Sequence, residues 1–422
     1  MAHLCLITEA YPPEIRSASV LMQDLANELV ASGHNVTVLT TMPRYNLARH
    51  EDPPPRRAVE GSVRVVRIPS VFLHNVGPWL KALGQFWLSL PIVAAGWRSI
   101  PRFDSVIVYT PPLPLVIAGF ILARAHRARL IVNVQDLFPQ NAIDLGVLKN
   151  PFSITFFRRL EQFGYEYAHS LVVHSSGNAR WLSDQGYGEK IAVIHNWFDF
   201  SPIERDPERR VLAEIGVPAR FTVFFGGVMG YAQDLDVILE AAAELRDQPD
   251  IQFLLVGDGV DRERAEAEAR RNLCANVFFR GFVDPPMYRR LLGSVDVGLL
   301  TLRSRMKTPV VPNKLLSFLA AQLPVAAALN SESDANALIF EAGAGINIPA
   351  GDGKSLAEAI RKFYLNPNFA AECGRLGREY GLRRFSVRRA VEEYTRLVMT
   401  DGMGPLKAPC PEGRKSRIEG HG

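Results

Sequence analysis

The sequence is poor in features that mark several common classes of protein. Its 422 residues include four cysteines, Cys5, Cys274, Cys373 and Cys410, without the close spacing of a zinc site. Cys5 falls in an apolar run, so we expect reduced thiols in a cytoplasmic protein and no disulfide framework. Neither sign of charge is in large excess. The 48 basic and 44 acidic residues give a net charge of +4, too small to indicate nucleic acid as a partner.

Two nucleotide-binding motifs are missing as well. The first apolar run leads into TEAYPPEIRSASV (8–20), which contains no G-x-G-x-x-G, and no acidic residue ends the second run. This argues against a nicotinamide-dependent dehydrogenase. No G-x-x-x-x-G-K-[ST] occurs, which argues against a P-loop kinase. The N-terminus has no basic segment before a long apolar core, so we expect no signal peptide.

Short runs rich in Val, Ile and Leu alternate with helical patterns along most of the chain. Such alternation predicts parallel sheets covered on both faces. A polar, proline-bearing stretch at 199–210 interrupts it. We therefore expect an α/β protein with two doubly wound domains, 1–200 and 201–385, that bind ligands where their strands end. The expected strands are 4–8, 35–40, 63–69, 105–110, 129–134, 170–175 and 191–196, followed by 221–225, 252–257, 276–281, 296–302 and 324–329.

The stretch at 77–102 differs from the other helical patterns. It contains Trp79, Trp87 and Trp97 between basic ends, and its apolar part is interrupted by Pro91 and too short to span a bilayer comfortably. It is either a core helix of the first domain or an interfacial helix that docks on the inner face of the membrane. The tail at 404–422 is rich in Pro, Gly and charge, and we expect it to be disordered.

Two glycine-rich turns follow strands of the second domain. One contains Gly226, Gly227 and Gly230, and the other contains Gly257 and Asp258. Glycines allow close backbone approach, and the N–H groups of a following helix can hold phosphate oxygens. The alternative is that the glycines only tighten a turn between strand and helix.

Several segments in order now support a resemblance to a known family. VIVYTPPLPL, VNVQDLFPQ, GGVMGYAQDLDVILEAA, LLVGDG and VPNKLLSFLAAQLPVAA resemble glycosyltransferase family 4, with a match over about residues 3–400. They are most similar to the subgroup that adds N-acetylfucosamine-type or fucose-type sugars to bacterial surface polysaccharides. The resemblance implies a GT-B fold of two Rossmann-like domains. It further implies that the C-terminal domain holds the nucleotide-sugar donor, that the N-terminal domain holds the acceptor, and that helix 386–400 packs back on the latter.

The same resemblance implies transfer with retention of configuration and without a metal or other cofactor. The chain departs from the family at two places. The family's Glu-x7-Glu pattern falls on Pro309 and Ser317, and its diphosphate-neutralising Arg and Lys fall on Val228 and Gln233. Lys314 is then the expected substitute, because a cation at a helix start adds to the free N–H groups there. Its alternative is an ordinary surface lysine. We assign the donor to Asn313, Lys314, Leu315 and Ser317 together with the glycine turns.

The first domain supplies the other candidate residues. Asp136 follows strand 129–134, where a carboxylate can accept a proton from the acceptor hydroxyl, although it can also cap the next helix. Gln135 and His174 are expected on the acceptor side, and His174 has a structural alternative. Asn196 and Arg16 are expected on the donor side. The catalytic residues are thus Asp136 and Lys314.

These residues predict a retaining glycosyltransferase that moves a sugar, from a UDP-linked donor, to a lipid-linked or saccharide acceptor in surface polysaccharide biosynthesis. The enzyme would be cytoplasmic, with peripheral contact to the inner membrane face through 77–102 and no nucleic acid as partner. Two alternatives remain. One is a GT-B-like nucleotide-sugar epimerase, and the other is a non-catalytic scaffold, which the loss of both glutamates makes plausible.

Overall fold

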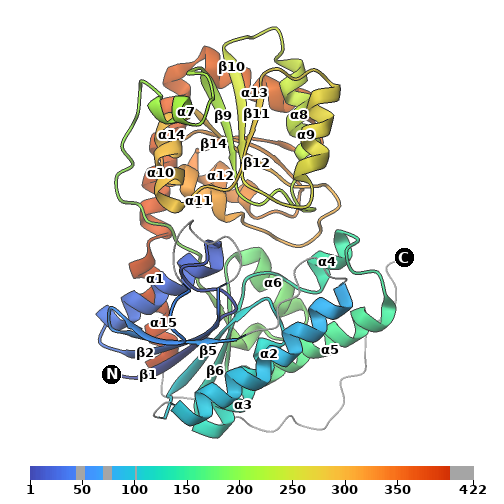
Figure 1. Ribbon diagram of the computed structural model, residues 1–422. Coiled ribbons are helices and arrows are strands. Elements are labelled where there is room, and N and C mark those ends of the chain that lie inside the picture. Colours follow the sequence, from blue (N-terminus) through green and yellow to red (C-terminus); the bar gives the residue numbers. More distant parts are fainter. Residues whose placement is uncertain (44–52, 70–77, 100–101, 400–422) are drawn as a thin grey trace.

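The computed structural model contains two α/β domains stacked one above the other (Figure 1). It describes residues 1–43, 53–69, 78–99 and 102–399, and within the helix at 78–99 it describes the side chains of 87–97. The predicted tail at 404–422 lies outside the described residues, as does the side chain of Trp79.

The first domain is built on an eight-stranded sheet. Its strand order is β3-β4-β2-β1-β5-β6-β7-β8, and all neighbours are parallel except β3 and β4. The strands are β1 (His3–Ile7), β2 (Asn35–Thr41), β3 (Arg57–Glu60), β4 (Val63–Ile68), β5 (Ser105–Thr110), β6 (Arg129–Val134), β7 (Ser170–Val173) and β8 (Ile191–Val193). The order reverses between β1 and β5, which makes this pair the switch point where open α/β sheets bind ligands.

Helices cover both faces of this sheet. Successive residues of β1 show why: Cys5 and Ile7 join one core, and Leu4 and Leu6 join the other. The first core is closed by α2 (Pro78–Ser99), α3 (Leu115–His126), α5 (Pro151–Tyr167) and α6 (Ser176–Asp184), and the second by α1 (Ser17–Ala31) and α15 (Val387–Met399). A short helix, α4 (Gln140–Asp144), follows β6.

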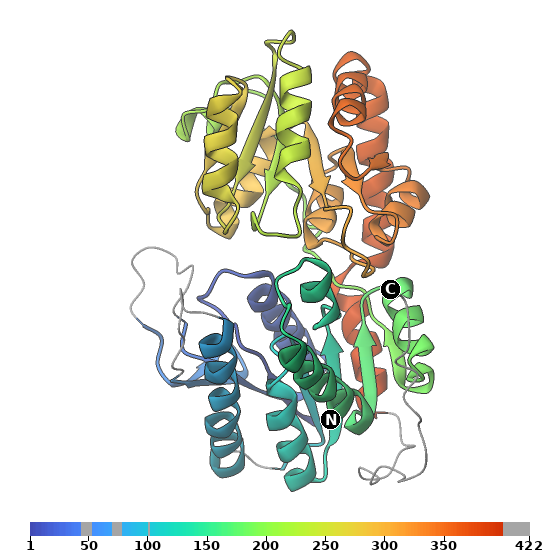
Figure 2. The ribbon, with the colours of Figure 1, turned by 90° about the vertical axis from the view of Figure 1, so that its right-hand side faces the viewer.

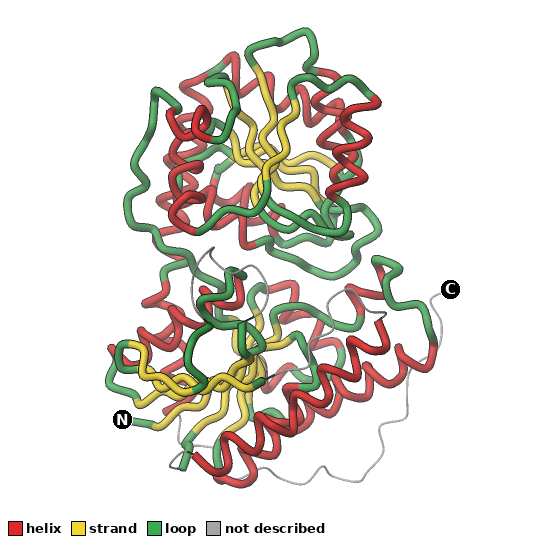
Figure 3. Tube along the Cα trace, viewed as in Figure 1, coloured by secondary structure: helices red, strands yellow, loops and turns green. Residues whose placement is uncertain are grey.

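The second domain has a six-stranded, wholly parallel sheet with the order β11-β10-β9-β12-β13-β14. Its switch point lies between β9 and β12. The strands are β9 (Phe221–Gly226), β10 (Ile251–Val256), β11 (Val277–Arg280), β12 (Val297–Thr301), β13 (Val325–Leu329) and β14 (Gly345–Pro349). Figure 3 shows the strands of each domain enclosed by helices.

The helices of the second domain also form two layers. Residues of α8 (Leu235–Glu244), α9 (Arg262–Arg271) and α13 (Gly353–Leu365) share one core. Residues of α7 (Arg210–Glu214), α10 (Pro285–Ser294), α11 (Asn313–Ala320), α12 (Ala335–Ala342) and α14 (Pro367–Arg384) share the other. The predicted fold class, two doubly wound domains with the GT-B arrangement, is confirmed.

The chain crosses between the domains twice, and the two crossings touch. The backbone N–H of Phe198 donates to the carbonyl oxygen of Phe385 at 3.1 Å, and Arg378 donates to the carbonyl oxygen of Phe200. After the second crossing α15 packs into the first domain, where Tyr394 is fully buried (Figure 1). The junction between the domains thus consists of two segments in contact rather than of a single linker.

The helix predicted at 77–102 appears as α2, which lies along the outside of the first domain (Figure 2). One of its sides enters the core through Leu88 and Ile92. Trp87, Leu90 and Trp97 are exposed at 68%, 60% and 60%. Within the described part of the chain, no helix has the length and apolarity needed to cross a bilayer.

Candidate active site

The two glycine turns pack against each other at the carboxyl edge of the second sheet. The N–H of Gly227 donates to the carbonyl oxygen of Val256, and the N–H of Met229 donates to that of Asp258. A Cβ on Gly257, whose φ is +144°, would lie 1.9 Å from the carbonyl oxygen of Gly227. Close contact between the turns therefore requires glycine at Gly257, which supports the structural alternative for this position.

The remaining members of these turns have internal partners. The N–H of Gly230 donates to the side chain of Gln233, the residue at the place of the family's lysine. A Cβ on Gly226 would meet the ring of Tyr288 at 2.6 Å. Asp258 is exposed, and its carboxylate accepts the N–H of Gly259. The turns therefore shape the edge of the sheet, while several of their N–H groups are already satisfied.

The start of α11 lies beside this edge. The ammonium of Lys314 sits 3.6 Å from the centre of the Phe225 ring on β9, and an ideal Cβ on Gly227 would be 3.8 Å from its nitrogen. Burial lowers the pKa of Lys314 to about 7. The first turn of α11 has no acidic residue, and no side chain caps its N-terminus. A cation and the positive end of the helix dipole therefore coincide without a carboxylate from that turn.

Two other residues assigned to the donor have side chains inside the domain. Leu315 is fully buried in the core. The hydroxyl of Ser317 donates to the carbonyl oxygen of Lys314 at 2.8 Å and lies 2.9 Å from the hydroxyl of Tyr288. Ser317 is 2% exposed. These side chains position the first turn of α11, and neither offers a polar group to the space beyond it.

Asp136 follows β6 on the facing domain. The N-cap position of α4 is Pro139, and no side-chain hydrogen bond caps that helix, so the capping alternative for Asp136 is wrong. Solvent reaches the Asp136 side chain, yet the protein around it displaces enough water to raise the pKa of its carboxyl. Its charge also contributes, after burial, to the raised pKa of Tyr109 on β5. Asp136 is therefore available as a proton acceptor close to the switch point of the first sheet.

His174 has a structural environment. Its Nδ1 lies 2.9 Å from the carbonyl oxygen of Ile194, and its Nε2 lies 2.9 Å from the side chain of Asn133. Burial lowers the pKa of His174 to about 4, so the ring is neutral at physiological pH. Both neighbours are acceptor oxygens, so the single N–H of the neutral ring donates to one of them, and these protein contacts favour the structural alternative for this residue.

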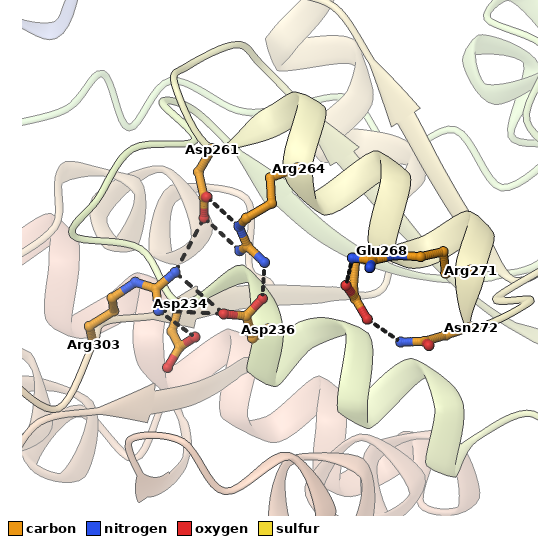
Figure 4. Close-up of polar contacts among 8 residues, drawn as sticks. All are labelled: Asp234, Asp236, Asp261, Arg264, Glu268, Arg271, Asn272 and Arg303. Atoms are coloured by element: carbon orange, nitrogen blue, oxygen red, sulfur yellow. Dashed lines mark hydrogen bonds and ion pairs between the residues drawn. The ribbon is translucent and has the colours of Figure 1, made fainter.

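Two arginines that could supply a cation in place of Lys314, Arg16 and Arg303, already contact carboxylates. Arg16 lies 2.6 Å from Glu14 and 3.9 Å from Glu9. Figure 4 shows Arg303 between Asp234 and Asp236 at the start of α8 and Asp261 at the start of α9. The distances to these carboxylates are 3.8, 3.4 and 3.3 Å, in that order. These ion pairs neutralise Arg303 within its own domain.

Three of the predicted residues meet across the domain junction. The amides of Gln135 and Asn196 exchange two hydrogen bonds, and Asn196 donates a third, of 2.9 Å, to Asn313. Two further contacts, which the sequence did not reveal, join the domains nearby. The N–H of Gly177 donates to Asp334 at 2.7 Å, and the N–H of Lys307 donates to Asp144 at 3.0 Å. Their partners are 157 and 163 residues apart, so no local pattern could have indicated them.

Comparisons with known proteins agree with this architecture. The model of the "Glycosyl transferase 4-like domain" matches residues 18–197, and that of the "Glycosyl transferases group 1" domain matches 220–366. The probable glycosyltransferase WbjE of Pseudomonas aeruginosa is 28% identical over 264 residues, which are 61% of this chain. The match spans 66% of WbjE, just under two thirds of its length. The putative colanic acid biosynthesis glycosyl transferase WcaI of Escherichia coli K12 is 24% identical over 74% of this chain and 79% of its own.

Solved structures resemble the whole described fold. Sucrose-phosphate synthase of Thermosynechococcus elongatus aligns with a TM-score of 0.73 and 15% identity, over 94% of this chain and 98% of that one. Anabaena HepE, solved with UDP and glucose, aligns with a TM-score of 0.69 and 16% identity, over 94% and 99%. WaaG, a glycosyltransferase involved in lipopolysaccharide biosynthesis, aligns with a TM-score of 0.63 and 16% identity, over 94% of this chain and 100% of that one. With its 4-like domain followed by a group 1 domain, the chain belongs to the glycosyltransferases of the GT-B fold.

Proposed function

We propose that this glycosyltransferase moves a sugar from a UDP-linked donor to a lipid-linked or saccharide acceptor during bacterial surface polysaccharide biosynthesis. The observation that carries the proposal is the start of α11, where Lys314 stands at a helix N-terminus without an acidic neighbour in the same turn. The role of WcaI in colanic acid biosynthesis and that of WaaG in lipopolysaccharide biosynthesis support the pathway, and the UDP complex of HepE supports the nucleotide. We retain an N-acetylfucosamine-type or fucose-type sugar as the proposed donor.

In the proposed reaction the donor diphosphate lies at the start of α11. Negative charge grows on the leaving phosphate as the glycosidic bond breaks, and Lys314 with the helix N-terminus stabilises it. Asp136 accepts the proton of the attacking hydroxyl. Attack from the leaving-group face retains the configuration of the sugar and requires no enzymatic nucleophile. The chain lacks the two glutamates of the family, but stabilising the negative charge on the leaving phosphate requires positive charge, which Lys314 and the helix N-terminus supply.

A panel of nucleotide sugars, with release of free nucleotide measured in the presence and absence of a lipid-linked acceptor, tests the proposal. Release that depends on the acceptor is expected. An isomerised donor would instead indicate the epimerase alternative, and absence of nucleotide-sugar binding would indicate the scaffold. The Asp136→Asn variant should lose about 10²-fold or more in turnover while its affinity for donor stays the same. An equal loss of donor affinity would show that Asp136 does not act on the acceptor side.

We further propose that the first domain docks on an anionic membrane surface through α2. Trp87, Leu90 and Trp97 are separated by three and seven residues, which places them on one side of the helix, and this side is exposed. Aromatic side chains of this kind favour the boundary between water and lipid. A lipid-linked acceptor would then be reached from the surface in which it resides.

Flotation with vesicles that contain anionic lipid tests the docking. Trp87→Glu combined with Trp97→Glu should abolish association, because each replaces an apolar ring by a charge. Phe340→Glu is the matched control, since Phe340 is 85% exposed on α12 of the other domain. Unchanged flotation of the folded double variant would refute the docking proposal while leaving the proposed reaction intact.

A further inference from the structure

Three amide side chains form a continuous bridge between the domains. Gln135 follows β6, Asn196 stands where the chain leaves the first domain, and Asn313 opens α11. The side-chain oxygen of Asn196 accepts a hydrogen bond of 3.1 Å from the Gln135 amide nitrogen, and the Asn196 amide nitrogen donates one of 2.9 Å to the Gln135 oxygen. Its second N–H donates to the side-chain oxygen of Asn313 at 2.9 Å. We call this set of residues, Gln135, Asn196 and Asn313, the amide bridge.

Asn196, the central residue of the bridge, has a partner for each hydrogen-bonding group of its side-chain amide. Both N–H groups of Asn196 and its oxygen have partners within the bridge, and the residue is 9% exposed. A buried amide that loses a partner costs free energy, so this arrangement resists displacement. Asn196 therefore has no free donor with which to hold a sugar or a phosphate while the bridge is intact.

The bridge is also anchored in the core of the first domain. The Gln135 amide donates to Asn133 at 3.2 Å, and the Asn133 amide donates to the hydroxyl of Tyr394 at 2.9 Å. Tyr394 belongs to α15, the helix that returns from the second domain, and it is fully buried. The Nε2 of His174 lies 2.9 Å from the same Asn133 oxygen that accepts from Gln135. One end of the bridge is thus fixed, so a displacement of α11 would have to break it.

Each end of the bridge immediately precedes a residue of the proposed chemistry. Gln135 precedes Asp136, and Asn313 precedes Lys314. We infer that Asn196 is a positioning residue for sugar transfer: it holds the acceptor-side segment 135–136 and the donor-side segment 313–314 at a fixed separation. This inference rests on the proposed function. It assigns Asn196 a role that differs from direct donor binding, because its amide binds other amides.

Asn196→Ala should separate turnover from donor binding. Loss of the bridge lets the two segments move, and a displacement of about 1 Å can cost roughly 10²-fold in rate. We therefore expect turnover of transfer to fall about 30- to 100-fold, while the dissociation constant for UDP changes less than about twofold. Asn196→Asp should behave alike, because a carboxylate has the same shape but no N–H to donate. Asn272→Ala, which removes an amide bonded to Glu268 on α9, is the control and should match the wild type.

A double-variant cycle tests whether Asn196 acts through Asn313. Once Asn196→Ala has broken the bridge, adding Asn313→Ala should reduce turnover by less than it does alone in the wild type. Calorimetry with UDP and acceptor-dependent nucleotide release supply the two measurements. Asn196→Ser, whose hydroxyl is too short to join both neighbours, replaces the alanine variant if that variant does not fold.

Three results would overturn the inference. They are unchanged turnover in folded Asn196→Ala, a loss of UDP affinity as large as the loss of turnover, and independent effects of the two substitutions. Failure of the proposed function has a different signature, since the wild type would then release no nucleotide with any donor and acceptor of the panel. Wild-type transfer combined with any one of the three results rejects the positioning role alone.

Discussion

Two helices of the second domain begin near the same edge of one sheet, yet their starts have opposite electrostatic character. At α8, Asp234 occupies the N-cap position, Asp236 lies in the first turn, and Arg303 is held between these carboxylates and Asp261 (Figure 4). At α11 the first turn has no acidic residue, and its cation rests on an aromatic ring. The positive pole of α8 is occupied by the protein's own anions, whereas that of α11 has no such carboxylate and, in the proposed function, receives the donor diphosphate.

Under the proposed function, this difference separates a cation that stabilises the fold, Arg303, from one that binds a ligand, Lys314. Asp261 also receives two hydrogen bonds from Arg264, and these hold the pKa of its carboxyl below the usual range. The cluster at α8 is therefore a self-neutralising network. Lys314 has no such compensating carboxylate among the causes of its shift, and burial lowers its pKa. An unfavourably buried cation gains most when a diphosphate arrives.

The largest expected effect comes from removing the cation at α11. Lys314→Ala should reduce turnover about 10²- to 10³-fold, because the interaction strengthens as charge develops on the leaving phosphate. Lys314→Arg, which stays charged and can stack on Phe225, should recover part of that loss. Steady-state kinetics with a nucleotide sugar and acceptor measure both variants. Full activity of Lys314→Ala would mean that the two helix starts do not differ in function.

A carboxylate placed at α11 should make this start resemble that of α8. Asn313→Asp keeps an oxygen for the Asn196 amide but adds negative charge beside the expected diphosphate. We expect UDP affinity to fall roughly tenfold, the scale of a like-charge contact near a protein surface. Asn272→Asp, at the residue that follows α9, makes the same chemical change away from the site and should leave affinity for UDP unchanged. Equal affinities for Asn313→Asp and wild type would contradict the comparison.

The lowered pKa of Lys314 predicts the direction of a pH dependence. Above pH 7 the free protein holds a neutral lysine, whereas bound diphosphate raises the pKa and restores the proton. Binding therefore takes up a proton, and UDP affinity should fall roughly fivefold between pH 7 and pH 8. Calorimetry in buffers with different ionisation enthalpies measures this uptake. The UDP affinity of Lys314→Ala should not change with pH over the same interval. A wild-type affinity that is equally independent of pH would refute proton uptake by Lys314.

The same shift predicts how stability changes with pH. Lys314 has a lower pKa in the folded chain than in the unfolded chain, so between pH 7 and the ordinary lysine pKa the unfolded state binds more protons. The contribution of this residue to the free energy of unfolding therefore rises with pH in that interval. Lys314→Met should remove this slope in denaturant titrations. A slope that persists unchanged would have to come from another group.

The smallest expected effect on the ligand comes from the cation at α8. Arg303→Ala leaves Asp234, Asp236 and Asp261 without their shared partner, so the free energy of unfolding should fall by about 1–3 kcal/mol. UDP affinity should change less than about twofold. Denaturant unfolding and calorimetry on the same sample measure both quantities. A loss of UDP affinity without a loss of stability would show that Arg303 turns toward the ligand.

The fold could be predicted because buried parallel strands appear in the sequence as continuous apolar runs. Val106, Ile107 and Val108 of β5, for example, are all fully buried. Two strands escaped prediction for physical reasons. β3 is a short antiparallel edge strand with charged residues at both ends. β14 begins with Gly345 and ends with Pro349, residues that weaken a strand pattern.

The site could be predicted only where local sequence determines it. Lys314 can be proposed from the sequence because a helix start with a cation and no acid is a local pattern. The partners of Arg303 and the amide bridge depend on how distant segments pack. Asn196 and Asn313 are 117 residues apart, and Gln135 lies 61 residues from Asn196. Sequence reasoning found all three bridge residues but expected each of them to face a ligand.

The most direct measurement is calorimetry of UDP and of uridine with wild type, Lys314→Ala and Arg303→Ala. If α11 is the diphosphate site, Lys314→Ala should bind UDP about 1.5–3 kcal/mol more weakly, roughly 10- to 150-fold, the scale of a charge-assisted hydrogen bond. Uridine, which lacks phosphates, should bind that variant and the wild type equally, and Arg303→Ala should bind both ligands as the wild type does. Normal binding of UDP by Lys314→Ala would contradict the account and show that α11 does not hold the diphosphate through its lysine.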